Sequence, residues 1–266
     1  MIKKKTSQVS VITVVYNGAE IIEGTILSVL GQTYKDVEYI IIDGGSSDST
    51  FEILDRYNDK LSHWVSEPDK GIYDAMNKGV AICSGEWVIF MNAGDSFYDE
   101  NVLSNIFDYN HENSDVIYGA VNCFDKFKEV IIKPDNLLKI THKMIFCHQS
   151  SLVRRELLLN NRFDMRYKIA ADYNLFYNLY ANGFKFVEMP VCIANYEVGT
   201  GLSSKNGYQG AKDNLMINKN WGKPSHMVGF YYGCLSFYTR FYLKKILPYR
   251  LVRKLLLIKY NKVKTS

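Results

Sequence analysis

The first 120 residues alternate between short apolar runs and amphipathic segments. Runs rich in Val, Ile and aromatic residues predict buried strands at Val9–Tyr16, Val37–Ile42, His63–Val65, Glu86–Met91 and Asp115–Val121. Apolar residues at helical spacing predict intervening helices from Ile21 to Leu30, from Asp48 or Ser49 to Tyr57, and over Ile72–Ile82 and Glu100–Asn110. Strands and helices that alternate in this way indicate an α/β fold with a mostly parallel sheet flanked by helices.

The pattern after Val121 is less regular. It predicts a strand at Cys147–Val153 and helices at Ala171–Ala181 and Gly207–Asn220. Hydrophobic residues make up 47% of the chain and charged residues 23%, so the chain has enough apolar surface for a folded core. The five cysteines are scattered and never spaced as C-x-x-C, which argues against a disulfide framework or a zinc site and favours a reducing compartment.

The composition of the chain changes near Trp221. No Asp or Glu follows Asp213, whereas 11 Lys or Arg lie between Asn214 and Ser266. We therefore predict a catalytic domain over residues 1–224 and a basic, aromatic, helical extension over residues 225–266.

The extension has the composition of an interfacial anchor. The segment Met227–Leu243 is rich in Phe and Tyr but is interrupted by Arg240, so it is too polar to span a bilayer. Beyond Pro248, the basic residues Arg250, Arg253 and Lys254 fall on one helical face, and Leu251, Leu255 and Ile258 fall on another. Basic residues beside aromatic ones favour binding to an anionic membrane surface. The alternative is that the aromatic residues pack on the domain or form a contact in a homo-oligomer.

Polar residues follow three of the predicted strands, where α/β sheets bind ligands. Asn92-Ala93-Gly94-Asp95 presents one carboxylate after a strand, and Mg²⁺ or Mn²⁺ on a diphosphate needs only one or two protein carboxylates. Asp43 and Asp74 could accept hydrogen bonds from a base or ribose, and Tyr16 could stack on a base. Each of these residues is by itself more typical of a turn, a helix surface or packing.

Two further residues are candidates for proton transfer or ligand contact. Asp172 begins a predicted helix, where it could act as a general base or only interact with the helix dipole. His148 lies in Phe146-Cys147-His148-Gln149, and a lone histidine is more often structural. The motifs H-E-x-x-H, G-x-S-x-G and G-x-x-x-x-G-K-S/T are absent, and no G-x-G-x-x-G follows the first strand. The sequence therefore argues against a zinc protease, an α/β-hydrolase, a P-loop NTPase and a dinucleotide-binding domain.

The order of these segments resembles the family 2 glycosyltransferases from about Val9 to Ser203. The resemblance rests on segments that contain the candidate residues, namely Val9–Asn17, Ile41–Thr50, Gly71–Gly79, Phe90–Asp95, His148-Gln149, Tyr167–Tyr173 and Gly201–Ser203. It is greatest to bacterial enzymes that assemble colanic-acid-type exopolysaccharide and related surface glycans. It implies a GT-A-like, Rossmann-related fold.

The resemblance also implies residue roles. Tyr16, Asp43 and Asp74 match positions that hold uridine, with Asn92 beside them. Asp95 matches the metal ligand of the family's D-x-D motif, and Asp172 matches its catalytic base. His148 is a candidate contact to the acceptor or to phosphate. Asn92 and Gly94 replace the usual acidic residues of D-x-D, so metal binding without nucleotide is expected to be weak.

The function that follows is inverting transfer of one sugar from a UDP-sugar, with Mn²⁺ or Mg²⁺, to a glycan or a polyprenyl-diphosphate-linked acceptor. The Q-x-x-R-W motif of processive synthases is absent, which favours single transfer. We expect a cytoplasmic protein on the inner face of the cell membrane and no nucleic-acid partner. A sugar-1-phosphate nucleotidyltransferase is disfavoured because Asn17-Gly18-Ala19-Glu20 replaces a phosphate loop. A non-catalytic glycan- or nucleotide-sugar-binding relative stays open.

Overall fold

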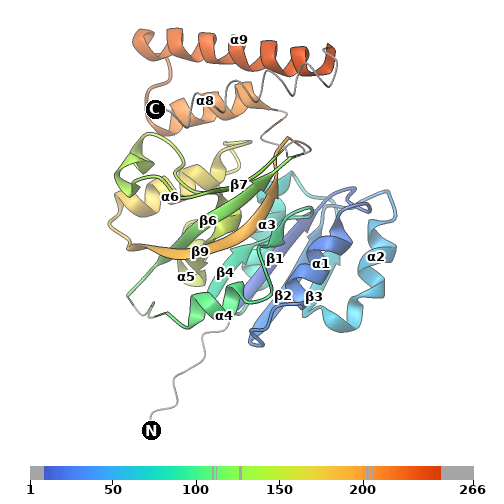
Figure 1. Ribbon diagram of the computed structural model, residues 1–266. Helices are drawn as coiled ribbons and strands as arrows, with labels where there is room; N and C mark the ends of the chain where they lie inside the picture. The colour runs from blue at the N-terminus through green and yellow to red at the C-terminus, as the bar shows by residue number, and fades with distance from the viewer. Residues whose placement is uncertain are drawn as a thin grey trace. The chain divides into compact units, whose positions relative to one another are not determined.

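The computed structural model describes residues 9–109, 111, 113–125, 128–199, 201, 204 and 206–246. The chain divides into two compact units, Met1–Gly201 and Leu202–Ser266. The first unit is a mixed sheet with helices packed against it (Figure 1).

The parallel half of the sheet forms the centre of the first unit. Strand β1 (Val9–Val15) lies between β2 (Val37–Asp43) and β4 (Trp87–Phe90), and β3 (His63–Ser66) lies outside β2. All seven residues of β1 are buried because helices cover both of its faces. On one face, Val9, Val11 and Val15 belong to the same apolar cluster as residues of α1 (Ile22–Leu30). On the other face, Ile12 contacts α3 (Ile72–Ile82), where a side chain at Gly79 would come within 2.6 Å of Ile12.

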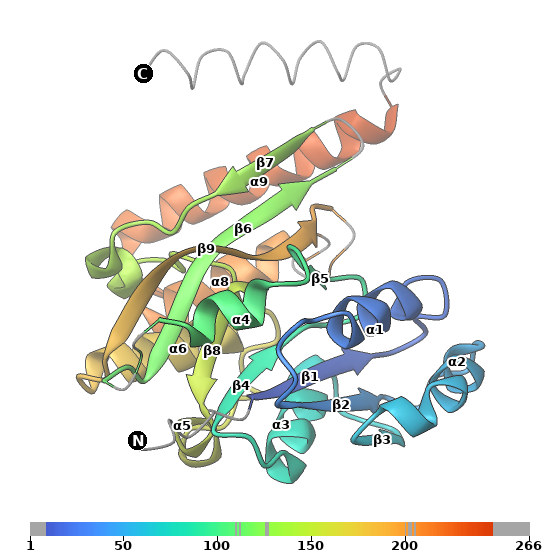
Figure 2. The same cartoon turned by 60° about the horizontal axis from the view of Figure 1, so that its bottom comes forward.

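The second half of the sheet combines antiparallel and parallel pairings. Its strand order is β3-β2-β1-β4-β8-β6-β9-β5, with β7 paired to β6 (Figure 2). These strands are β5 (Ser96–Phe97), β6 (Val116–Phe124), β7 (Glu129–Ile132), β8 (Ser151–Arg154) and β9 (Phe186–Glu197). The remaining helices of the first unit are α2 (Thr50–Arg56), α4 (Val102–Phe107), α5 (Arg155–Asn160) and α6 (Ala171–Ala181). Short 3₁₀ turns span Asn58–Lys60, Leu137–Thr141 and His148–Ser150.

The predicted α/β sheet is confirmed, with differences in its second half, where β5, β7, β9 and helix α5 were not predicted. The strand expected at Cys147–Val153 begins only at Ser151, because His148–Ser150 form a 3₁₀ turn. Strand β9 was not predicted, since Pro190 interrupts its apolar pattern. The pairing of β9 with β6 shifts register between Tyr118 and Val121, which accommodates this proline.

The second unit contains α8 (Gly207–Ile217) and α9 (Pro224–Ile246), which pack on each other. Phe230 of α9 lies 5.2 Å from Tyr208 and 5.3 Å from Trp221, measured between ring centroids. Within the described part of the chain, no helix combines the length and apolarity needed to cross a bilayer. The predicted extension begins at residue 225, one residue after the start of α9. The basic helical face predicted beyond Pro248 lies outside the described residues.

Candidate functional site

The predicted ligand-binding residues lie where parallel strands end. Tyr16 follows β1, Asp43 ends β2, and Asn92 and Asp95 lie in the turn after β4. Since β1, β2 and β4 are parallel neighbours, these residues lie along the same edge of the sheet.

Asp43 organises the loop after β2. Its side chain is buried, and its Oδ2 accepts hydrogen bonds from the Ser46 amide at 3.1 Å and the Ser66 hydroxyl at 2.5 Å. Its Oδ1 accepts a short hydrogen bond from the Ser46 hydroxyl. Both carboxylate oxygens are thus engaged by the protein, so Asp43 shapes the loop, and its direct contact with a base stays a prediction.

Tyr16 and Asp69 lie beside this loop, and Asp69 was not among the residues predicted from the sequence. The Tyr16 side chain is 65% exposed. A side chain at Gly44 would lie 2.5 Å from Asp69 Oδ2 and 3.4 Å from the Tyr16 ring, so Asp69 and Tyr16 both lie beside the Gly44 backbone. The Asp69 carboxylate accepts from the Gly71 amide at 2.7 Å, and Asp74 accepts from the Lys70 amide at 3.0 Å. Asp69 lies three residues after β3, and this position after a strand was the feature of the sequence that could have identified it as a candidate.

The turn after β4 is rigidly held. Gly94 has a φ of 94°, in the left-handed region that glycine enters without strain. The Thr25 hydroxyl accepts from the Gly94 amide at 3.0 Å and donates to the Asp95 carbonyl at 2.8 Å. This turn fixes Asn92 and Asp95 at the edge of the sheet.

Asp95 is a buried carboxylate with one free oxygen. The residue is 7% exposed, and its Oδ2 accepts a hydrogen bond from Gln149 at 2.9 Å. Its Oδ1 has no hydrogen-bond partner among the described residues. Burial raises the pKa of Asp95 to about 6, although Gln149 and nearby His148 oppose this rise. A carboxylate kept where ionisation is costly is typical of a functional site.

The turn also contains a second unpartnered oxygen. Asn92 Oδ1 is buried and has no hydrogen-bond partner in the described structure. The described residues include no cluster of three or more His, Cys, Asp or Glu that could hold a metal by themselves. Asp95 Oδ1 would therefore be the protein ligand of a divalent cation whose other ligands are phosphate oxygens and waters.

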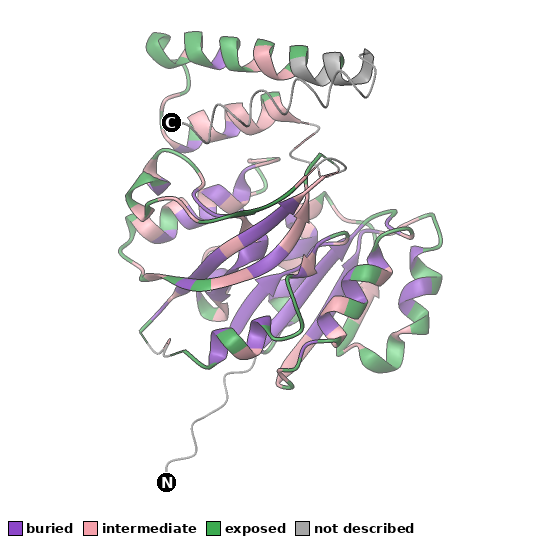
Figure 3. Cartoon of the chain, in the orientation of Figure 1, coloured by how far each residue is buried: buried purple, intermediate pink, exposed green. Residues whose placement is uncertain are grey.

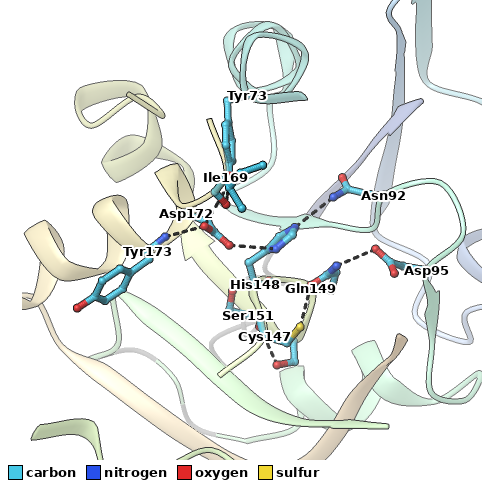
Figure 4. A network of polar contacts seen from close by, with 11 residues as sticks. Tyr73, Asn92, Asp95, Cys147, His148, Gln149, Ser151, Ile169, Asp172 and Tyr173 are labelled. Atoms are coloured by element: carbon cyan, nitrogen blue, oxygen red, sulfur yellow. Dashed lines mark hydrogen bonds and ion pairs between the residues drawn. The ribbon is translucent and has the colours of Figure 1, made fainter. Parts of the chain in front are cut away.

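A chain of polar contacts connects this turn to Asp172 (Figure 4). Asn92 Nδ2 lies 3.2 Å from His148 Nε2, and His148 Nδ1 lies 3.4 Å from Asp172 Oδ2. Because the amide group of Asn92 donates, His148 Nε2 accepts, and the proton of a neutral imidazole lies on Nδ1, facing Asp172. The structure thus brings together three residues that were singled out separately from the sequence.

The other oxygen of Asp172 is anchored by the protein. Asp172 Oδ1 accepts from the Tyr173 amide at 2.8 Å, and the Tyr73 hydroxyl lies 3.3 Å away. The Tyr73 hydroxyl also donates to the Ile169 carbonyl at 2.7 Å. Burial and the charge of Asp172 raise the pKa of Tyr73, which keeps it protonated. Asp172 lies in the first turn of α6, where the helix dipole favours a carboxylate.

The turn with the buried Asp95 is thus connected to Asp172 on a mixed, mostly parallel sheet flanked by helices, an arrangement consistent with a GT-A fold. The model of the family described as glycosyl transferase family 2 matches residues 10–166. The chain belongs to this family, which confirms the predicted class and fold.

Individual relatives agree with this assignment. The chain is 30% identical over 210 residues to the PGL/p-HBAD biosynthesis glycosyltransferase of Mycobacterium bovis, covering 73% of this chain and 78% of that protein. Two solved structures show the same fold. S. aureus TarS 1-349 in complex with UDP-GlcNAc has a TM-score of 0.65 at 19% identity, with coverage of 79% of this chain and 64% of that chain. The mannosyltransferase PcManGT from Pyrobaculum calidifontis, in complex with GDP-Man and Mn²⁺, has a TM-score of 0.62 at 17% identity. This match covers 99% of this chain and 82% of that chain.

The burial of Asp95 predicts a pH-dependent stability. Its native pKa, about 6, exceeds the ordinary aspartate value of about 3.9, so the native state binds a proton more tightly than the unfolded state does. The free energy of unfolding therefore falls as pH rises from about 4 to about 6. We expect Asp95→Asn, which cannot ionise, to gain about 2 to 3 kcal/mol over the wild type between pH 4 and pH 8.

Urea denaturation of both proteins in metal-free buffer at pH 4, 6 and 8 measures this gain. The exposed Asp59→Asn is the matched control and should follow the wild type. A difference between Asp95→Asn and the wild type that does not change with pH would contradict the assignment.

Proposed function

We propose that this protein transfers a single sugar, with inversion, from a UDP-sugar to a hydroxyl of a glycan or a polyprenyl-diphosphate-linked acceptor. The observation that carries the proposal is the contact chain Asn92–His148–Asp172. It connects the turn that would hold the diphosphate with a carboxylate that would act as base.

The donor side supports a nucleotide diphosphate sugar. The exposed ring of Tyr16 suits stacking on a base, and the carboxylates of Asp69 and Asp74 lie in the loop after β3 and in the first turn of α3. The two similar structures hold UDP-GlcNAc and GDP-Man, so the fold serves both nucleotides. We choose UDP because Tyr16, Asp43 and Asp74 match the uridine-binding positions of the family.

The acid–base chemistry follows from the arrangement around Asp172. Its Oδ1 is held by the Tyr173 amide, which orients the carboxylate, and Oδ2 faces His148. Asp172 would remove the proton of the acceptor hydroxyl as that oxygen bonds to the anomeric carbon and UDP leaves. His148 would hold Asp172 in position and contact the acceptor or a phosphate. A divalent cation at Asp95 would neutralise charge on the departing diphosphate.

The second unit supports docking at an anionic membrane. Phe230 packs against α8, whereas Val228, Tyr231, Tyr232 and Leu235 of α9 are more than 60% exposed (Figure 3). Their spacing of three to four residues places them along one side of the helix. With the basic residues that follow, this surface, which we call the α9 outer face, suits the headgroup region of a bilayer. A lipid-linked acceptor would be reached there, at the cytoplasmic side.

The role of Asp172 is testable by rate. We expect Asp172→Asn to bind UDP as the wild type does but to lose about 10²- to 10⁴-fold in transfer rate, the usual share of a general base. The assay follows UDP release from a panel of UDP-sugars with Mn²⁺, alongside UDP affinity by calorimetry. Asp164→Asn, on the loop before α6, is the matched control. Near-normal turnover of Asp172→Asn would remove it from the mechanism, and absence of any UDP release by the wild type would favour a non-catalytic binder.

The α9 outer face is testable by vesicle flotation. We expect the full chain to float with vesicles that contain anionic lipid, and salt to weaken this binding. Replacing Tyr232 and Leu235 by Ser removes apolar contacts and should reduce flotation severalfold. Leu138→Ser, at an equally exposed leucine of the first unit, is the control. Equal flotation of all three proteins, or of none, would contradict membrane docking by this face. Packing on the protein or self-association would then explain the apolar residues of the α9 outer face.

A further inference from the structure

A row of polar side chains crosses the sheet immediately beyond Asp95. Ser96 of β5 is paired with Asn195 of β9, and Asn195 is paired with Asn122 of β6 (Figure 2). Residues paired directly across neighbouring strands project from the same face of a sheet. The row therefore begins one residue after the carboxylate of the proposed metal site.

The amide groups of this row are held by hydrogen bonds. Asn122 Nδ2 donates to Asn195 Oδ1 at 2.8 Å and to Glu129 Oε1 at 2.6 Å. Asn195 Nδ2 in turn donates to Ser96 Oγ at 3.1 Å and to the Phe97 carbonyl at 2.9 Å. All the amide protons of both asparagines are thus used within the row, which fixes the orientation of their oxygens.

One oxygen of the row has no partner. Asn122 is 3% exposed, and its Oδ1 is buried without a hydrogen-bond partner in the described part of the chain. Leaving a buried polar atom unpaired costs about 1 to 3 kcal/mol, and such atoms are few in native proteins. The neighbours of Asn122 in β6, Val121 and Cys123, are apolar and belong to the core cluster. An apolar residue at 122 would avoid this cost, which indicates that the Asn122 amide is needed to hold Asn195 and Glu129 in place.

The row forms part of an open cleft within the first unit. The cleft has a volume of about 530 Å³, and its lining includes Ser96, Asn122, Asn195, Phe124, Lys128 and Glu129. Amide, hydroxyl, carboxylate and ammonium groups together match the alternating donors and acceptors of a polyhydroxylated ring. The ring of Phe124 offers an apolar surface to the less polar face of such a ring. Volumes of this size are typical of small-molecule sites.

We propose that this cleft binds a saccharide unit of the acceptor, an inference that rests on the proposed function. The nucleotide-side residues Tyr16 and Asp43 follow β1 and β2, whereas the cleft is built on β5, β6, β7 and β9, beyond β4 in the strand order. Asp95, in the turn after β4, lies between the nucleotide-side residues and the cleft in this strand order. Inversion requires the acceptor oxygen to approach the anomeric carbon from the face opposite the departing diphosphate. A saccharide anchored in the cleft would then approach from the side away from the proposed nucleotide site.

Saturation-transfer NMR tests the proposal with the full chain, saturating UDP and Mg²⁺. The probes are the methyl glycosides of glucose, galactose, mannose, rhamnose and N-acetylglucosamine. We expect at least one of them to receive saturation from the wild type. Asn122→Leu and Glu129→Ala should each weaken its binding about tenfold or more, since each removes a polar group of the cleft. Ile132→Thr, an exposed residue of β7 outside the cleft, should bind it as the wild type does.

Two further measurements make the result decisive. Calorimetry should show the same UDP affinity in the wild type and all variants. Thermal melting checks that Asn122→Leu folds. If Asn122→Leu does not fold, the result for Glu129→Ala decides the outcome. If the wild type binds UDP but none of the methyl glycosides, or if the folded cleft variants bind them undiminished, the acceptor cleft is wrong. Failure of the wild type to bind UDP would instead contradict the proposed function.

Discussion

The burial of one carboxylate at the end of the central strand β4 is the constraint on which the site depends. Asp95 is almost enclosed by protein, so its ionisation is opposed by desolvation and is favoured only by Gln149 and His148. A cation that brings its own phosphate ligands would remove that cost. The turn supports this arrangement by fixing Asp95 and Asn92 against Thr25 of α1. The cost of burying this charge in the protein alone would thus become affinity for a cation.

The same turn connects the three parts of the proposed reaction. On one side lie Tyr16 and the loops after β2 and β3, which suit a nucleotide. On another, Asn92 reaches Asp172 through His148. Beyond it, Ser96 begins the polar row that ends at Asn122. Because β4 is hydrogen-bonded to both β1 and β8, this turn is positioned by the parallel and the mixed halves of the sheet together.

The sequence predicted the parallel half of the fold well, because its strands are continuous apolar runs that end at Asn, Gly or Asp. It also predicted helix α3 at Ile72–Ile82 with the observed bounds. Strand β9 escaped prediction because Pro190 and a register shift break its pattern, and its pairing with β6 is non-local. In the site, Asn92, His148 and Asp172 were named individually. Their contacts join Asn92 to His148, 56 positions apart, and His148 to Asp172 on a different element, which no local pattern encodes. Asn122 and Asp69 were missed for the same reason, since each resembles an ordinary strand or turn residue until its neighbours are known.

The central claim is that Asp95 holds a divalent cation together with a nucleotide diphosphate. Calorimetric titration of UDP into the protein, with and without Mn²⁺, tests it most directly. We predict that Mn²⁺ strengthens UDP binding to the wild type and to the exposed control Asp59→Ala. We also predict that Asp95→Ala abolishes this strengthening but still unfolds cooperatively on heating. Metal-dependent UDP affinity that is unchanged in Asp95→Ala would contradict the account.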